Sequence, residues 1–239
     1  SDQSWTGALL ENVGNQSYSS AQELDVSADM WGVMFDAIAV DIDRDLDLDL
    51  YMCNDFGEQI APNGWLYNDS GSFYEDDQRS SDVVAHCMGS SFADLNLDGE
   101  LDIYVAGNGN QFLLMGSEDG WAESEAAWRM PAFDPFQMAW GSVFSDFNND
   151  GLVDLMVSTS DFAESGHELF PVWFLQQTEH LTFEERGAEL GFPQRAGGRG
   201  VIAHDLNQDG ILDFLIADAF GDPWMFVSQG CTKEHWVEI

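Results

Sequence analysis

The sequence has 239 residues, of which 44% are hydrophobic and 13% aromatic, so it contains enough apolar material for a folded core and is not typical of a disordered chain. Its 44 acidic and 7 basic residues give a formal net charge of -37. A surface this negative repels phosphate backbones and anionic lipids, which excludes nucleic acid as a partner. No run of about 18 apolar residues is present, so we expect no membrane span.

The first predicted elements are short strands joined by polar turns. Residues 9–18 form a hairpin pattern, with an apolar start, a Gly-Asn turn and an aromatic end. Residues 38–52 then alternate strand, tight acidic loop and strand, with the acidic loop at 41–49. A second hairpin follows at 65–73, where an aromatic residue opens the strand after the turn.

This unit recurs three more times along the chain. The acidic loops lie at 41–49, 94–102, 146–154 and 205–213, and the later hairpins begin at Phe112, Trp173 and Trp224. The loops start 52 to 59 residues apart, so each repeat holds two hairpins, or four short strands. That is the size of a propeller blade. We predict an all-β fold, a β-propeller or propeller segment of about four four-stranded blades, over residues 1–230, followed by a tail at 231–239. An all-β solenoid is the alternative, less favoured because its coils are usually much shorter than 50 residues.

The acidic loops share the spacing Asp-x-(Asp/Asn)-x-Asp-Gly-x-x-Asp. Calcium takes about six to eight oxygen ligands and prefers carboxylates, whereas magnesium prefers to keep its waters. Side chains at positions 1, 3, 5 and 9 and the carbonyl at position 7 can supply these oxygens, and glycine at position 6 permits the bend. Without a cation the carboxylates would repel one another. A solvated Asp-Gly hairpin is the alternative for one loop, but four copies in the same strand context favour calcium.

We therefore predict about four Ca²⁺ per chain. The first loop departs from the pattern, because Leu46 replaces the glycine and Asp47 adds a carboxylate, so its site is expected to be ligated differently. The predicted ligands are Asp41, Asp43, Asp45, Asp47 and Asp49; Asp94, Asn96, Asp98, Glu100 and Asp102; Asp146, Asn148, Asp150, Leu152 and Asp154; and Asp205, Asn207, Asp209, Ile211 and Asp213.

These loops resemble those of the FG-GAP/VCBS repeat family, the calcium-bearing blades also found in the propellers of integrin α-subunits. Residues 66–73 are most similar to the bacterial and cartilage-acidic-protein branch, in which the propeller is often followed by an ASPIC/UnbV segment. Residues 235–239 resemble the opening of that segment. Propellers of this family usually have seven blades, so the resemblance implies part of a larger ring, or an array completed by other material.

Several other residues have two possible roles. In a propeller, Cys53 and Cys87 are expected on adjacent inner strands, where they form either a disulfide or two buried thiols. Arg195 and Arg199 either meet an anionic ligand in a central channel or, as we favour, pair with carboxylates. Trp31, Trp140 and Trp173 either stack on a sugar or pack between blades.

The predicted function is a calcium-binding scaffold that is secreted or displayed at the cell surface. It would serve cell adhesion or contacts with other proteins or glycans in an extracellular assembly, with calcium structural in each blade. No Ser-His-Asp order, nucleotide-binding glycine loop or HExxH motif is present, so we assign no catalytic residue and expect a protein that is not an enzyme. Two alternatives stay open, a polysaccharide-active lyase or hydrolase on a calcium-bearing propeller, and a lectin.

Overall fold

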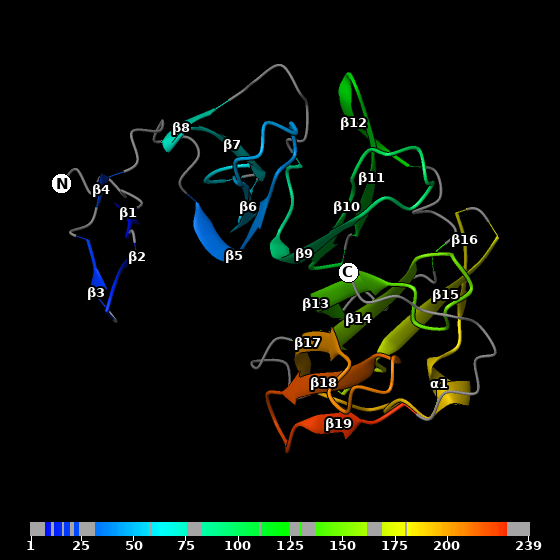
Figure 1. The fold of residues 1–239 in the computed structure, drawn as a ribbon. Coiled ribbons are helices and arrows are strands. Elements are labelled where there is room, and N and C mark those ends of the chain that lie inside the picture. Colours follow the sequence, from blue (N-terminus) through cyan, green and yellow to red (C-terminus); the bar gives the residue numbers. More distant parts are fainter. Residues whose placement is uncertain are drawn as a thin grey trace. The chain divides into compact units, whose positions relative to one another are not determined.

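The computed structural model describes residues 8–10, 12–15, 17–19, 22–23, 32–57, 59–75, 83–109, 111–124, 130, 137–161, 169–179 and 181–228 (Figure 1). The chain divides into two compact units, Ser1–His86 and Cys87–Ile239. Across the described ranges the elements are strands apart from one helical turn, α1 (Gly187–Leu190). No helix in these ranges is long and apolar enough to cross a bilayer.

The first unit contains one four-stranded antiparallel sheet and two short strand pairs. In the pairs, β1 (Ala8–Leu9) lies beside β4 (Gln22–Glu23), and β2 (Asn12–Gly14) beside β3 (Ser17–Tyr18). The sheet has the order β5-β6-β7-β8, with β5 (Val33–Val40), β6 (Asp49–Asp55), β7 (Gly64–Asp69) and β8 (Ser72–Glu75). Sequential strands are therefore neighbours, as the two-hairpin pattern predicts.

The second unit contains three more sheets with the same sequential order. One has β9 (Cys87–Ala93), β10 (Asp102–Gly107), β11 (Phe112–Ser117) and β12 (Gly120–Glu123). The next has β13 (Met138–Ser145), β14 (Asp154–Ser160), β15 (Trp173–Glu179) and β16 (Thr182–Glu185). The last has β17 (Gly198–His204), β18 (Asp213–Asp218) and β19 (Trp224–Phe226).

Neighbouring blades of the second unit meet through their first strands, where glycines allow close backbone contact. A Cβ on Gly89 of β9 would lie 2.5 Å from the carbonyl oxygen of Trp140 in β13. A Cβ on Gly141 would lie 2.9 Å from the Cα of Gly200 in β17. Real Cβ atoms do not tolerate such distances, so these glycines are required by packing rather than by a turn.

Each pair of neighbouring blades in this unit encloses its own hydrophobic core, because the two faces of adjacent sheets are both apolar. Between the second and third blades, Tyr104, Leu113, Leu155 and Leu175 are almost fully buried around Trp173. The core between the third and fourth blades is built largely from phenylalanine side chains in mutual ring contact, namely Phe147, Phe174, Phe192, Phe214 and Phe226.

The predicted all-β fold, with four blades of a β-propeller type, is confirmed. Three blades have four strands each, and the last has three among the described residues. The tail at 231–239, with its ASPIC/UnbV resemblance, lies outside the described residues, and the domain boundaries stay a prediction.

Candidate metal loops

Each acidic loop connects the first and second strands of a blade, and all four loops have left-handed residues at the same two positions. The residues at positions 4 and 6 have left-handed φ angles, a region that non-glycine residues rarely adopt. At position 4 the angles are 66° for Arg44, 58° for Leu97, 57° for Asn149 and 61° for Gln208. At position 6 they are 78° for Leu46, 92° for Gly99, 89° for Gly151 and 87° for Gly210. The bend predicted from the glycine is thus present in all four loops, and the second bend at position 4 was missed.

The carboxylate at position 1 caps the loop backbone in the three glycine loops. Asp94 accepts hydrogen bonds from the N–H groups of Asp98 (3.1 Å) and Gly99 (2.9 Å). Asp146 and Asp205 make the same pair of bonds. Both oxygens of this carboxylate therefore have a donor, and the loop is organised by its own backbone.

The side chains at positions 3 and 5 add further bonds within the loop. The amide nitrogen of Asn96 donates to Asp98 at 2.8 Å, and its amide oxygen accepts from the Asp98 N–H at 3.1 Å. Asn148 with Asp150 and Asn207 with Asp209 repeat this arrangement. A carboxylate or amide oxygen can accept more than one bond, so these bonds do not by themselves exclude a cation.

The aspartate at position 9 opens the second strand of every blade and is at most 1% exposed. One of its oxygens accepts the N–H of position 2, and the other accepts an N–H from the third strand. In the third blade Asp154 bonds Phe147 (3.2 Å) and Gln177 (2.8 Å) in this way. The equivalent residues Asp49, Asp102 and Asp213 do the same. This aspartate ties loop, second strand and third strand together, a role that its spacing did not reveal.

Burial shifts the pKa of two of these anchors, Asp102 and Asp154. It raises the pKa of Asp102 to about 6 and that of Asp154 to about 7, although the N–H bonds act in the opposite direction. The negative charges at positions 1 and 5 raise both values further. In the first loop, burial and then the charges of Asp49, Asp45 and Asp41 raise the pKa of Asp43. A divalent cation would remove the like-charge part of this cost.

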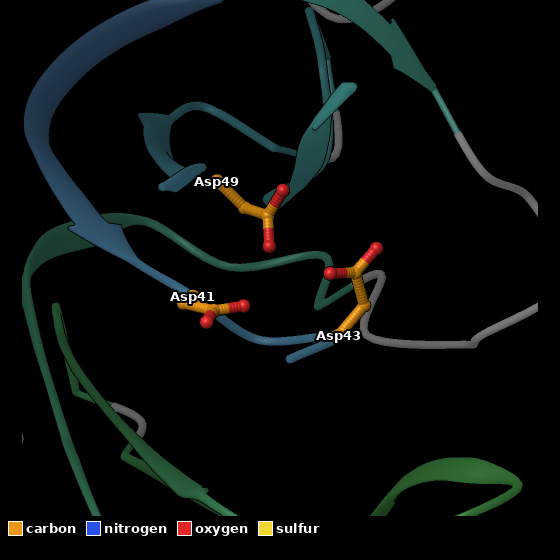
Figure 2. Close-up of side chains that lie close together, drawn as sticks. All are labelled: Asp41, Asp43 and Asp49. Atoms are coloured by element: carbon orange, nitrogen blue, oxygen red, sulfur yellow. The ribbon is translucent and has the colours of Figure 1, made fainter. Parts of the chain in front are cut away.

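The first loop has a different internal arrangement. One carboxylate oxygen from each of Asp41, Asp43 and Asp49 lies within 4.8 Å of the others, and Figure 2 shows the three groups facing a common centre. Asp41 accepts one bond, from the Leu46 N–H at 3.1 Å. Its Oδ1 is buried and has no hydrogen-bond partner among the described residues. A buried carboxylate oxygen without a donor is costly.

Carboxylate, amide and carbonyl oxygens are the ligands that a hard divalent cation prefers, so the chemistry of the predicted donors fits such an ion. The acidic groups lie closest together in the first loop, where one oxygen from each of Asp41, Asp43 and Asp49 lies within 4.8 Å of the others. In each of the other three loops, the predicted ligands also come from a single loop. Among the described residues, however, no three acidic groups of these loops lie as close together as those of the first loop. The ligand set stays a prediction in all four.

The arginines and cysteines named in the sequence analysis lie outside the acidic loops. The Arg199 guanidinium stacks 3.7 Å from the Trp140 ring centroid and donates to Ser160 Oγ (2.5 Å) and to the Asp161 carbonyl (3.0 Å). The arginine is therefore held by the neighbouring blade rather than presented to a ligand. Arg195 is exposed. Cys53 and Cys87 are both fully buried in β6 and β9, and the disulfide between them stays a prediction.

Repeated blades with an acidic loop between their first two strands define a β-propeller. The FG-GAP-like repeat model matches residues 94–157 and 146–216, which together span just over half of the sequence. The chain belongs to this FG-GAP-like repeat family. The finer ASPIC/UnbV branch stays a prediction.

Among solved structures, the fold is similar to that of an Agrocybe aegerita lectin, described in terms of its specific recognition of non-reducing terminal N-acetylglucosamine. The two share 13% identity with a TM-score of 0.51, over 87% of this chain and 54% of the lectin chain. The chain thus spans about half of that structure, and the likeness concerns the fold alone. No curated protein matches the sequence.

Proposed function

We propose that this chain is a calcium-stabilised β-propeller scaffold that works outside the cell, where it binds protein or glycan partners. The observation that carries the proposal is the first acidic loop, in which three carboxylates converge and one buried oxygen lacks a donor. The same nine-residue pattern recurs in the three other blades.

Calcium would be held by the side chains at positions 1, 3, 5 and 9 and by the carbonyl at position 7. The bound ion supplies positive charge that offsets the repulsion between these carboxylates. The chain's own contribution is to place the oxygens: left-handed residues at positions 4 and 6 fold the loop, and the position 9 aspartate fixes it to the third strand. An ion that binds this folded loop better than the unfolded chain stabilises the blade.

The chemistry of such a site supports an extracellular setting. A loop that offers a few carboxylates on an exposed hairpin is suited to modest affinity, and extracellular calcium modules commonly bind with a Kd of about 10⁻⁴ to 10⁻³ M. A propeller stiffened in this way presents fixed surfaces, which is what an adhesion or assembly protein requires. The lectin with a similar fold supports glycans as one class of partner to test.

The first test is thermal unfolding with calcium and with a chelator, together with the metal content of the purified chain. An ion present at a hundred times its Kd adds about 2.7 kcal/mol per site, and 1 kcal/mol shifts the Tm of a chain this size by about 2–4 °C. We expect chelation to lower the Tm by roughly 5–15 °C, reversibly, with several calcium ions per chain.

The control separates calcium binding from simple loss of charge. D41N/D43N removes two carboxylates from the first loop, and E118Q/D119N removes two exposed carboxylates from the turn between β11 and β12. The loop variant should lose part of the calcium response and the turn variant should keep it. Absence of bound calcium, or an equal response in both variants, would overturn the proposal. A glycan array and a pull-down, each with and without calcium, then identify the partner.

A further inference from the structure

The fourth blade exposes an apolar row on one face of its sheet. Ile202, Leu215 and Met225 hold directly paired positions on β17, β18 and β19. Their side chains are 59%, 39% and 58% exposed, respectively. Single exposed apolar residues are common on protein surfaces, but a contiguous apolar patch marks an interaction surface, because its burial is favourable.

The same ladder positions are buried in the two preceding blades of the second unit. The pairs at these positions are Tyr104 with Leu113 in the second blade, Met156 with Phe174 in the third, and Leu215 with Met225 in the fourth. In the second and third blades these side chains are at most 5% exposed, because they pack against the following blade. We call the face that carries these pairs the forward face, and the opposite face, which carries Leu155 and Phe214, the rear face.

A glycine in the first strand of the fourth blade is a second, independent observation. A Cβ on Gly89 or Gly141 would lie 2.5 Å or 2.9 Å from the backbone of the next blade. Gly200 holds the same place, since it pairs with Ala217 as Gly89 pairs with Ala106. Among the described residues, the nearest atom to a Cβ on Gly200 is the Ala217 Cβ, at 3.8 Å. The φ of Gly200 is not left-handed, so neither a turn nor the packing of these residues requires a glycine there.

We propose that the forward face of the fourth blade binds a second copy of this chain, through the rear face of that copy's first blade. Within the second unit, each contact between blades joins a forward face to a rear face, so the partner should offer a rear face. The first blade offers one along β5. Ala39 is exposed and pairs with Leu50, which holds the ladder position of Leu155. At the place of Ala39 in the third blade, Phe144 packs against the core shared with the second blade.

The size of the related fold agrees with two copies. A contact between two different faces is heterologous, and such contacts form a closed ring when the rotation allows it. The similar lectin fold matches 87% of this chain but only 54% of its own chain, so two copies would have about the extent of that chain. The proposed contact uses no carboxylate of an acidic loop, so it stands or falls separately from calcium binding.

Sedimentation velocity of the full chain tests the contact. It is run in calcium and high salt, because chains with a formal charge of -37 repel each other at low ionic strength. We expect the wild-type chain to form a dimer as its concentration rises. G200A puts a methyl group where the second copy's backbone would approach, and should raise the dissociation constant at least about tenfold. Its Tm should not fall, since the chain's own atoms leave room for the methyl group. G221A, on the same blade but outside the forward face, is the matched control and should dimerise like the wild type.

A mixing experiment tests which faces meet. A39E puts a charge on the rear face of the first blade and should weaken the dimer as G200A does. A mixture of G200A and A39E should dimerise better than either alone, because one copy keeps an intact rear face and the other an intact forward face. A wild-type chain that stays monomeric would overturn the proposal, as would equal dimerisation of G200A and G221A. A mixture no better than its components would also overturn it, since the contact would then not join a forward to a rear face.

Discussion

The first acidic loop and the three glycine loops bend at the same positions but differ in how their side chains are hydrogen-bonded. In the glycine loops the position 1 carboxylate accepts two backbone N–H groups, and an asparagine bridges positions 3 and 5. In the first loop Asp43 replaces that asparagine, Leu46 replaces the glycine, and Asp41 is left with a buried oxygen that has no donor among the described residues. The comparison teaches that the glycine loops give both oxygens of the position 1 carboxylate a backbone donor. The first loop keeps the bonds from the N–H groups of Asp45, Leu46 and Asp47, but it leaves one oxygen of its position 1 carboxylate without a donor among the described residues.

The largest effect should come from the position 9 anchor, which both kinds of loop share. D49A and D154A should each lower the free energy of unfolding by about 2–5 kcal/mol, because each leaves two buried or partly buried N–H groups without acceptors. Urea unfolding measures this, with D119A as the exposed control. If D49A lowers the free energy of unfolding much less than D154A does, the position 9 aspartate does not have the same role in the two kinds of loop.

Replacing the position 1 aspartate by alanine should change the free energy of unfolding by different amounts in the two kinds of loop. In chelator, D94A should cost about 1 kcal/mol, since the Gly99 N–H loses its acceptor while the Asp98 N–H keeps the Asn96 amide oxygen. D41A should cost less, because Asp41 accepts one such bond and its removal also removes the buried unpaired oxygen. Repeating the unfolding experiment with calcium should reverse the order. An unchanged order in calcium contradicts the view that the first loop depends on the ion.

The pH dependence of the metal-free protein should reflect the buried anchors. The pKa of Asp154 rises from 3.8 in the unfolded chain to about 7 in the folded one, so the folded state binds the extra proton. The stability from this group is complete below about pH 4 and is lost as the pH rises through 7. Unfolding in chelator at pH 5 and pH 8 should show this loss, and D154N, which cannot titrate, should reduce it. An identical pH dependence in both proteins excludes this anchor as the cause.

The smallest effect should come from the backbone of the first loop. Leu46 has a φ of 78° and its side chain is 90% exposed, so L46G removes strain without removing buried contacts. It should stabilise the protein by about 1 kcal/mol. L48G changes a neighbouring exposed leucine that is not left-handed and should destabilise by about 0.5–1 kcal/mol. Melting temperatures of the two variants give the comparison, and a destabilising L46G would show that the leucine has a packing role.

The sequence by itself determined the repeat, the strand–loop–strand order and the four acidic loops, because these are local features. Alternation of apolar residues, Asp-Gly turns and aspartate spacing are each read within about a dozen positions. The left-handed bend at position 6 was likewise predicted from glycine, and it is present even where Leu46 replaces it.

Only the tertiary structure decided what each aspartate of a loop does. Asp154 looks like one more ligand in the sequence, but its partner Gln177 lies 23 positions away on the third strand, and burial follows from that pairing. The contacts of Arg199 likewise come from residues distant in sequence, since Trp140 and Ser160 belong to the neighbouring blade. Long-range strand pairing brings these groups together, and the spacing of residues within one loop carries no information about it.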